Sequence, residues 1–165
     1  MKKTEQVKAK IHSVESLGLL LESWRKQGKT IVFTNGCFDI LHLGHADYLS
    51  KAANLGDVLI VGLNTDASVS RIKGADRPIT DERSRSFLMA SMQFVDAVVL
   101  FDEETPYELI RFVQPDILVK GKDYRAEDVV GYDIVMAKGG RVETIDLVEG
   151  YSTTSVIQKI LRTEK

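Results

Sequence analysis

Two of the three histidines in this chain of 165 residues stand three positions apart, in the segment TNGCFDILHLGHADYL (34–49). His42 and His45 follow a run of strand formers, so we expect them at or near the start of a helix, facing the same way. A helix start carries positive partial charge, and Gly44 leaves room for an anion beside backbone N–H groups. Two imidazoles in this setting suit a phosphorus centre that gains negative charge.

Two other interpretations of the histidine pair stay open, a metal-binding pair and two structural histidines. Zinc pairs on helices more often use a spacing of four with a third ligand nearby. His12, the remaining histidine, lies in the N-terminal segment. We therefore favour phosphate chemistry and assign no residue as a metal ligand.

Strand-like and helix-like segments must alternate to position these histidines. We predict strands at 30–35, 57–64, 96–101, 116–121 and 141–148, and helices at 44–55, 65–72, 82–94, 105–113 and 126–138. Ser13 would cap an additional helix over about 13–27 that ends at Gly28, and Ser152 or Thr153 would cap a last helix.

This alternation predicts an α/β fold: a single Rossmann-like domain, 1–165, with a five-stranded parallel sheet and helices on both faces. The N-terminal helix, about 13–27, would precede a catalytic core of about 29–162. Ligands of such sheets bind outside the carboxyl ends of the strands. The segments GCFDILHLGH, TDASVSRIKGADRP, KGKDY and EGYSTT follow strands, so we expect them to converge on one crevice.

Composition excludes several classes of protein. The net charge is −2, from 22 basic and 24 acidic residues, which gives no basic surplus for nucleic acid. The start, MKKTEQVKAK, has no apolar segment typical of a signal peptide behind it, and no apolar run approaches the roughly 18 residues of a membrane span. With a single cysteine and 44% apolar residues, we expect a cytoplasmic globular protein.

Cations after the strands are candidates for binding phosphate. Lys73, Arg77 and Arg85 lie in or after the second crossover, where each taken alone is better interpreted as a solvated surface cation. Lys120 ends an apolar strand, where a charge is costly unless it has a partner. Lys120 is therefore the first candidate and Lys73 the second.

Hydroxyls and carboxylates in the same segments have two interpretations each. Ser152, Thr153 and Thr154 could cap a helix and also hold phosphates. Asp39 could orient a histidine, accept a substrate hydroxyl or form an Asx turn, and for Asp66 helix capping is favoured.

The loop containing the histidines also contains the cysteine. Cys37 has no third group that would support a nucleophile, so we interpret it as a small loop residue whose backbone matters. The absence of GxGxxG after a strand argues against a dinucleotide site, and the absence of GxxxxGK[ST] excludes a P-loop.

The motif GCFDILHLGH resembles the GxFDxxHxGH signature of the HxGH nucleotidyltransferase superfamily, which includes cytidylyltransferases and pantetheine-phosphate adenylyltransferase. Over about residues 15–162 the chain is most similar to the adenylyltransferase domain of the bacterial ADP-heptose synthases. The segments that carry this resemblance are FTNGCFDILHLGHADYL, GDVLIVGLNTDASV, RIKGADRPI, TPYELI, PDILVKGKDY and EGYSTTSVIQKI.

The resemblance implies transfer of AMP from ATP to D-glycero-β-D-manno-heptose 1-phosphate, which gives ADP-heptose and pyrophosphate for lipopolysaccharide core or a related glycan. It implies Mg²⁺ bridging phosphate oxygens, a separate heptose 7-phosphate kinase in the same pathway, and a homodimer as a candidate assembly. The sugar phosphate is already ionised near neutral pH, so the chemistry needs positioning and charge stabilisation rather than a general base.

We accordingly predict three sets of site residues. The catalytic set is His42, His45 and Lys120. The ATP-binding set is Asn35, Gly36, Cys37, Phe38, Gly44, Lys73, Ser152, Thr153 and Thr154. The acceptor-binding set is Asp39, Asn64, Asp66, Arg77 and Arg85.

Two alternative functions remain, a glycerol- or ribitol-phosphate cytidylyltransferase and a non-catalytic nucleotide-binding module. The glycerol-phosphate enzymes have an arginine shortly before the STT and a lysine after the HxGH. This chain has LVEG and Asp47 at those places. The retained histidine pair and STT argue against a non-catalytic module.

Overall fold

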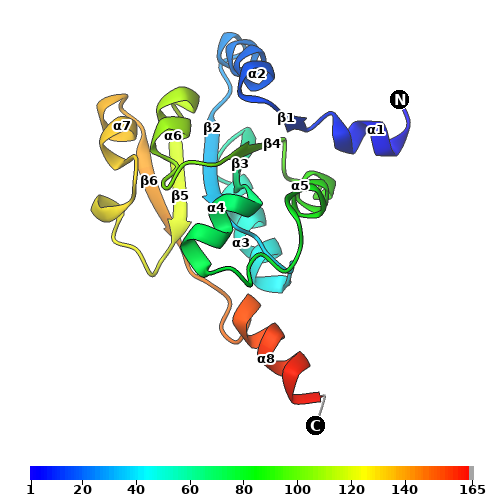
Figure 1. Ribbon diagram of the computed structural model, residues 1–165. Helices are drawn as coiled ribbons and strands as arrows, with labels where there is room; N and C mark the ends of the chain where they lie inside the picture. The colour runs from blue at the N-terminus through cyan, green and yellow to red at the C-terminus, as the bar shows by residue number, and fades with distance from the viewer. Residues whose placement is uncertain (164–165) are drawn as a thin grey trace.

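A computed structural model describes residues 1–163 and places six strands in one parallel sheet, in the order β1-β4-β3-β2-β5-β6 (Figure 1). The strands are β1 (Ile11–His12), β2 (Ile31–Gly36), β3 (Val58–Asn64), β4 (Ala97–Phe101), β5 (Ile117–Gly121) and β6 (Arg141–Ile145). β2 pairs with β3 from Ile31 opposite Val58, and β5 pairs with the other edge of β2. The order of strands therefore reverses between β2 and β5, which is where such sheets bind ligands.

Eight α-helices and one 3₁₀-helix connect or flank the strands of the described part. They are α1 (Lys3–Lys8), α2 (Val14–Lys26), α3 (Leu43–Ala53), α4 (Asp66–Lys73), α5 (Glu82–Ser91), α6 (Tyr107–Val113), η1 (Ala126–Asp128), α7 (Tyr132–Ala137) and α8 (Thr153–Thr163). Ser13 accepts a hydrogen bond from the Ser16 N–H and caps α2, and Gly28 follows that helix with a φ of 69°. The predicted limits of α2 are therefore confirmed.

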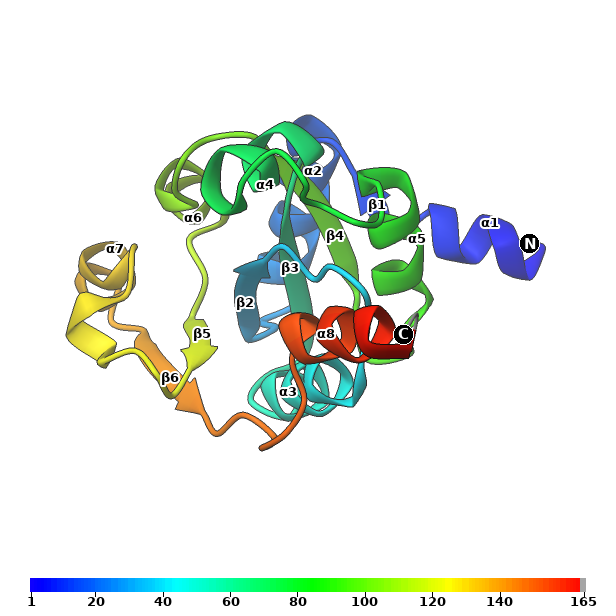
Figure 2. The same cartoon turned by 60° about the horizontal axis from the view of Figure 1, so that its bottom comes forward.

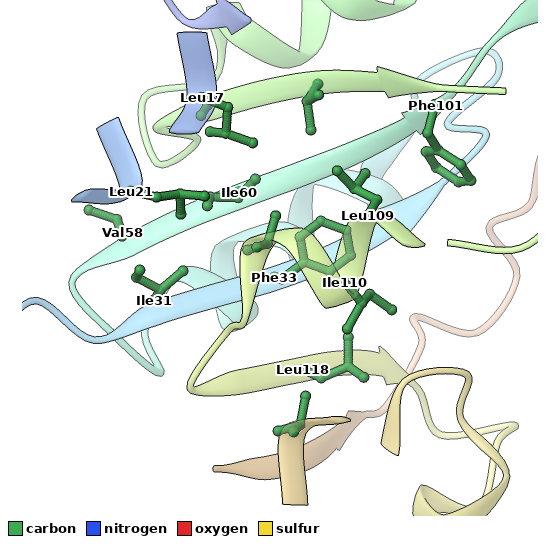
Figure 3. Packing of buried hydrophobic residues seen from close by; sticks show 14 of the residues in the cluster. Leu17, Leu21, Ile31, Phe33, Val58, Ile60, Phe101, Leu109, Ile110 and Leu118 are labelled. Atoms are coloured by element: carbon green, nitrogen blue, oxygen red, sulfur yellow. The ribbon is translucent and has the colours of Figure 1, made fainter. Parts of the chain in front are cut away.

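Alternate side chains of the strands build two cores, one on each face of the sheet. Ile31 and Phe33 of β2 pack with residues of α2, α6 and α7, and Figure 3 shows Phe33 beside Ile110 of α6. Val32 of β2 packs on the opposite face, against residues of α3 and α5 such as Leu49. Helices on both faces explain why the strands have continuous apolar runs, as predicted.

The prediction of five strands was wrong, because β1 is a sixth. β1 has only two residues, Ile11 and His12, which pair with Val98 and Val99 of β4, and so short a strand shows no periodicity. The helix predicted over 126–138 is divided into η1 and α7, since Gly131 has a φ of 90° between them.

Two helices at the ends of the chain project from the domain. Figure 1 shows α1 and α8 extending away from the body, and neither contains a buried residue. Within residues 1–163, no helix has the length and apolar character needed to cross a membrane.

Candidate active site

A cavity of about 370 Å³ lies at the carboxyl ends of β2 and β5, at the reversal of strand order. Most of the predicted site residues line it: Asn35, Gly36, Cys37, Phe38, Asp39, His42, Gly44, His45, Lys73, Arg77, Lys120, Ser152, Thr153 and Thr154. The four segments that were expected to converge on one crevice therefore do so.

The two histidine rings lie stacked at the start of α3. Their centroids are 3.8 Å apart and their planes differ by 24°. His42 is the N-cap residue of α3, and its side chain makes no capping bond to the helix. The Nδ1 atoms of both rings are buried without a hydrogen-bond partner among the described residues. Both rings therefore keep hydrogen-bonding capacity for a ligand in the cavity.

Gly44 gives the histidine pair its space. A Cβ atom at this position would lie 2.9 Å from Cε1 of His42 and 3.3 Å from Cβ of Tyr151. A side chain would therefore displace the His42 ring or the segment that leads into α8. The room beside Gly44 serves the histidine ring as well as any ligand.

Burial keeps both imidazoles neutral near pH 7. Burial lowers the pKa of His42, and burial together with the neighbouring His42 lowers the pKa of His45 to about 4. A neutral imidazole still donates one N–H, and phosphate charge beside it would favour its protonated form. The pair can therefore respond to negative charge that develops nearby.

The loop between β2 and α3 has an unusual backbone conformation that places an aromatic ring against His45. Phe38 and Ile40 both have a φ of 48°, in the left-handed region that side chains rarely adopt. The Phe38 ring meets His45 edge to face, with centroids 5.3 Å apart and planes at 71°. The loop between β2 and α3 thus uses a costly backbone conformation to place an aromatic side chain against a site histidine.

Lys120 reaches the cavity from the end of β5. Burial lowers the pKa of this ammonium to about 8, while Asp123 opposes the shift. Its Nζ lies 5.8 Å from the centre of the Tyr124 ring. A desolvated cation held so loosely is well suited to an anionic ligand.

Asp39 is buried at the centre of a hydrogen-bond network. Its carboxylate accepts from the N–H groups of Ile79 and Thr80, from the Thr80 hydroxyl and from Nε of Arg77. Burial alone would raise the pKa of Asp39, but these hydrogen bonds outweigh it and lower the pKa to about 2. The carboxylate is therefore ionised throughout the neutral range.

The structure does not bring Arg85, Asn64 and Asp66 to the cavity. The Arg85 side chain is 1% exposed and donates to the carbonyl oxygens of Cys37, Asn64 and Thr80 and to the Asp66 carboxylate. Arg85 therefore ties the histidine loop to β3 and α5 rather than facing a substrate. Its predicted role at the acceptor is corrected to a supporting one, because the side chain is buried away from the cavity and makes four hydrogen bonds within the protein.

The start of α8 presents three hydroxyl groups with different tasks. Ser152 accepts a hydrogen bond from the Ser155 N–H at 3.0 Å and caps the helix. Thr153 donates to the carbonyl oxygen of Asp39 at 2.7 Å. The Thr154 hydroxyl has no partner among the described residues, so it is the one most available to a phosphate.

Sequence reasoning missed several lining residues, all but one of them on the β5 and β6 side. These are Tyr48, Gly121, Asp123, Tyr124, Leu147, Val148 and Tyr151. Gly121, Asp123, Tyr124 and Tyr151 lie within KGKDY and EGYSTT, two of the segments singled out for their position after strands, and Leu147 and Val148 lie in the predicted strand 141–148. Tyr48 is buried, and its hydroxyl is 2.8 Å from the Thr34 hydroxyl. The sequence therefore indicated only that Tyr48 belongs to the apolar face of a helix.

Comparison with known proteins agrees with this geometry. A family model described as cytidylyltransferase-like matches residues 33–159, which includes the whole cavity. The chain belongs to the cytidylyltransferase-like family. The predicted resemblance to HxGH nucleotidyltransferases is therefore confirmed.

Similar curated proteins are longer than this chain. The "Bifunctional protein HldE" of Syntrophotalea carbinolica is 57% identical over 93% of this chain and 31% of that protein. The protein of the same name from Campylobacter jejuni is 58% identical over 92% of this chain and 31% of its own length. The chain thus spans about a third of these relatives.

Solved structures show the same fold. The lipopolysaccharide core biosynthesis protein from Thermoplasma volcanium GSS1 is 34% identical with a TM-score of 0.61, covering 76% of this chain and 100% of that one. Pantoate-beta-alanine ligase from Francisella tularensis has a TM-score of 0.61 at 16% identity, over 92% of this chain and 78% of that one, which shows the fold alone.

Proposed function

We propose that this protein transfers AMP from ATP to D-glycero-β-D-manno-heptose 1-phosphate, forming ADP-heptose and pyrophosphate. The stacked pair of His42 and His45 carries the proposal, because it lies in one cavity with Lys120 and the start of α8. Similarity to bifunctional HldE proteins over more than nine-tenths of this chain supports the choice of acceptor. The product would supply lipopolysaccharide core or a related glycan.

The proposed reaction needs no proton transfer from the protein. A phosphate oxygen of the sugar 1-phosphate attacks the α-phosphorus of ATP, and the bond from that phosphorus to the β-phosphate oxygen breaks. Pyrophosphate leaves with the electron pair. His42, His45 and Lys120 would donate hydrogen bonds to the oxygens on which charge develops.

We further propose that ATP is used as its Mg²⁺ complex. Asp39 and Asp123 are the carboxylates of the described cavity lining, and Asp39 is occupied by four donors. Among residues 1–163 no group of three or more His, Cys, Asp or Glu side chains could hold a metal. Mg²⁺ is commonly held by phosphate oxygens, water and one or two carboxylates, so Asp123 is the protein ligand that fits.

The test is the initial rate of pyrophosphate release from four mixtures: ATP or CTP, each with heptose 1-phosphate or glycerol 3-phosphate. We expect the ATP and heptose mixture to be fastest. A faster CTP and glycerol phosphate mixture would assign the chain to the cytidylyltransferases instead. ATP binding without pyrophosphate release in any mixture would indicate a non-catalytic module.

Two predictions about partners remain proposals. The relatives that match are described as bifunctional, and this chain corresponds to about a third of them. We propose that a heptose 7-phosphate kinase activity precedes this reaction in the same pathway. A homodimer is likewise a proposal, and light scattering at several protein concentrations would test it.

A further inference from the structure

The carboxylate of Asp39 has no capacity left for a substrate. Oδ2 accepts from Nε of Arg77 at 2.9 Å and from the Ile79 N–H at 2.8 Å. Oδ1 accepts from the N–H of Thr80 at 3.0 Å and from its hydroxyl at 2.8 Å. Two carboxylate oxygens offer about four acceptor sites, and all are used here. Asp39 is also only 2% exposed, so it acts on the cavity through its partners.

Arg77 is the partner of Asp39 that faces the cavity. Asp39 engages only its Nε, and the donors of both terminal nitrogens have no acceptor within the described residues. Arg77 lines the cavity, and its side chain is 16% exposed. A guanidinium anchored through Nε keeps a planar pair of donors for one anion, the geometry that arginine uses to bind phosphate.

The position of Arg77 favours the acceptor over ATP. Arg77 and Lys73 come from the end of α4 and the segment after it, beyond β3, while β5 and β6 lie on the other side of β2. The β5 and β6 side supplies one cation, Lys120, together with the apolar lining of Tyr124 and Leu147, a combination that suits a nucleotide with its base. A phosphorylated sugar has no base to stack, so the cationic side fits it better.

We propose that Asp39 is a positioning residue that turns the guanidinium of Arg77 toward the phosphate of the acceptor. This inference rests on the proposed function for the identity of the acceptor. Asp39 also receives the Thr153 hydroxyl on its backbone carbonyl, so the residue that orients Arg77 also contacts the start of α8.

Steady-state kinetics of Asp39→Asn, Arg77→Ala and the double variant test this role. A charge-assisted hydrogen bond contributes enough for about a 10-fold to 100-fold change. We expect both single variants to raise KM for heptose 1-phosphate by that factor while KM for ATP changes less than about threefold. The double variant should resemble Arg77→Ala, because Asp39 acts through Arg77.

The exposed ion pair of Arg71 and Asp102, 3.1 Å apart, offers a matched control. Asp102→Asn should leave both KM values unchanged. The inference would be overturned if the double variant raised KM for heptose 1-phosphate by the product of the two single effects. An equal rise in KM for ATP would also overturn it. Should Asp39→Asn fail to fold, Arg77→Lys keeps the charge but lacks Nε, and it should still raise KM for heptose 1-phosphate about tenfold.

An NMR measurement separates this inference from the proposed function. The Nε–H signal of Arg77 should be protected from exchange in the wild type and lose that protection in Asp39→Asn. Heptose 1-phosphate added without ATP should shift the Arg77 signal in the wild type. A shift without any pyrophosphate release would support the inference and reject the proposed function, whereas no shift would overturn the inference itself.

Discussion

The two segments that line the proposed phosphate-binding part of the cavity are held in opposite ways. The loop between β2 and α3 is held by hydrogen bonds of two buried side chains, Arg85 and Asp39. The start of α8 is held by the Thr153 hydroxyl on the Asp39 carbonyl, and the helix has no buried residue. Figure 2 shows α8 attached to the sheet by the segment that follows β6. The groups expected to act at the reacting phosphorus are thus preorganised, while those proposed to bind the nucleotide phosphates are loosely supported.

The histidine pair offers the strongest test of the rigid side. We expect His42→Ala or His45→Ala to lower kcat about 10²–10³-fold, the usual cost of removing one preorganised donor to developing charge. The apparent affinity for ATP should change far less. Steady-state kinetics with His12→Ala as the control measures this, and a kcat within a few-fold of wild type in both variants would reject the assignment.

Arg85 tests whether the rigid side is part of the folded framework. Lysine cannot reproduce donation to the carbonyls of Cys37, Asn64 and Thr80 together, so Arg85→Lys should lower the free energy of unfolding by about 2–3 kcal/mol. Urea denaturation measures the loss. Arg83→Lys, at an exposed position of the same helix, should change stability by less than about 0.5 kcal/mol. Equal effects of the two variants would contradict the buried role.

Lys120, which reaches the cavity from the end of β5 and belongs to neither segment, is tested through its charge. Its ammonium is charged below a pKa of about 8, so kcat/KM for an anionic substrate should fall up to tenfold per pH unit above that value. Lys120→Arg should remove this alkaline decline, because the guanidinium stays charged. Lys122→Ala is the control, since Lys122 is exposed and pairs with Asp146. A decline that persists in Lys120→Arg would place the titrating group elsewhere.

The hydroxyls of α8 should give the smallest effect and thereby sharpen the contrast. Thr154→Val removes a hydroxyl that has no described protein partner, and a neutral hydrogen bond corresponds to about a 2-fold to 10-fold change. We expect KM for ATP to rise by that factor with kcat nearly unchanged. Thr163→Val, near the far end of the same helix, should have no effect. A loss of kcat as large as that of the histidine variants would show that α8 is as tightly preorganised as the loop.

The sequence predicted the sheet and the place of the histidines because both depend on local patterns. Strand–helix alternation and a histidine pair after a strand are visible within about twenty residues. The buried, supporting role of Arg85 could not be predicted, because the carbonyl oxygens that accept its hydrogen bonds come from three separate segments. A charged residue is also usually exposed. The short strand β1 was not predicted, because two residues are too few to show a strand pattern.

Lys120 lies between these two cases. A lysine at the end of an apolar strand signals a charge that needs a partner, and the structure places it in the cavity. The aromatic and aliphatic residues that line the same cavity, such as Tyr124 and Leu147, carry no such conflict between residue type and position. A charged residue in an apolar segment can therefore be recognised from the sequence as a site candidate, whereas an apolar residue that lines the cavity cannot.

The backbone and the side chain of Phe38 have conflicting requirements for the residue type at this position. The backbone, with a φ of 48°, favours glycine, but the contact with His45 requires an aromatic ring. Replacement by glycine would relax the loop and remove the support of the histidine. Selecting residues at this position for thermal stability by backbone preference alone would therefore remove the contact that supports a proposed catalytic histidine.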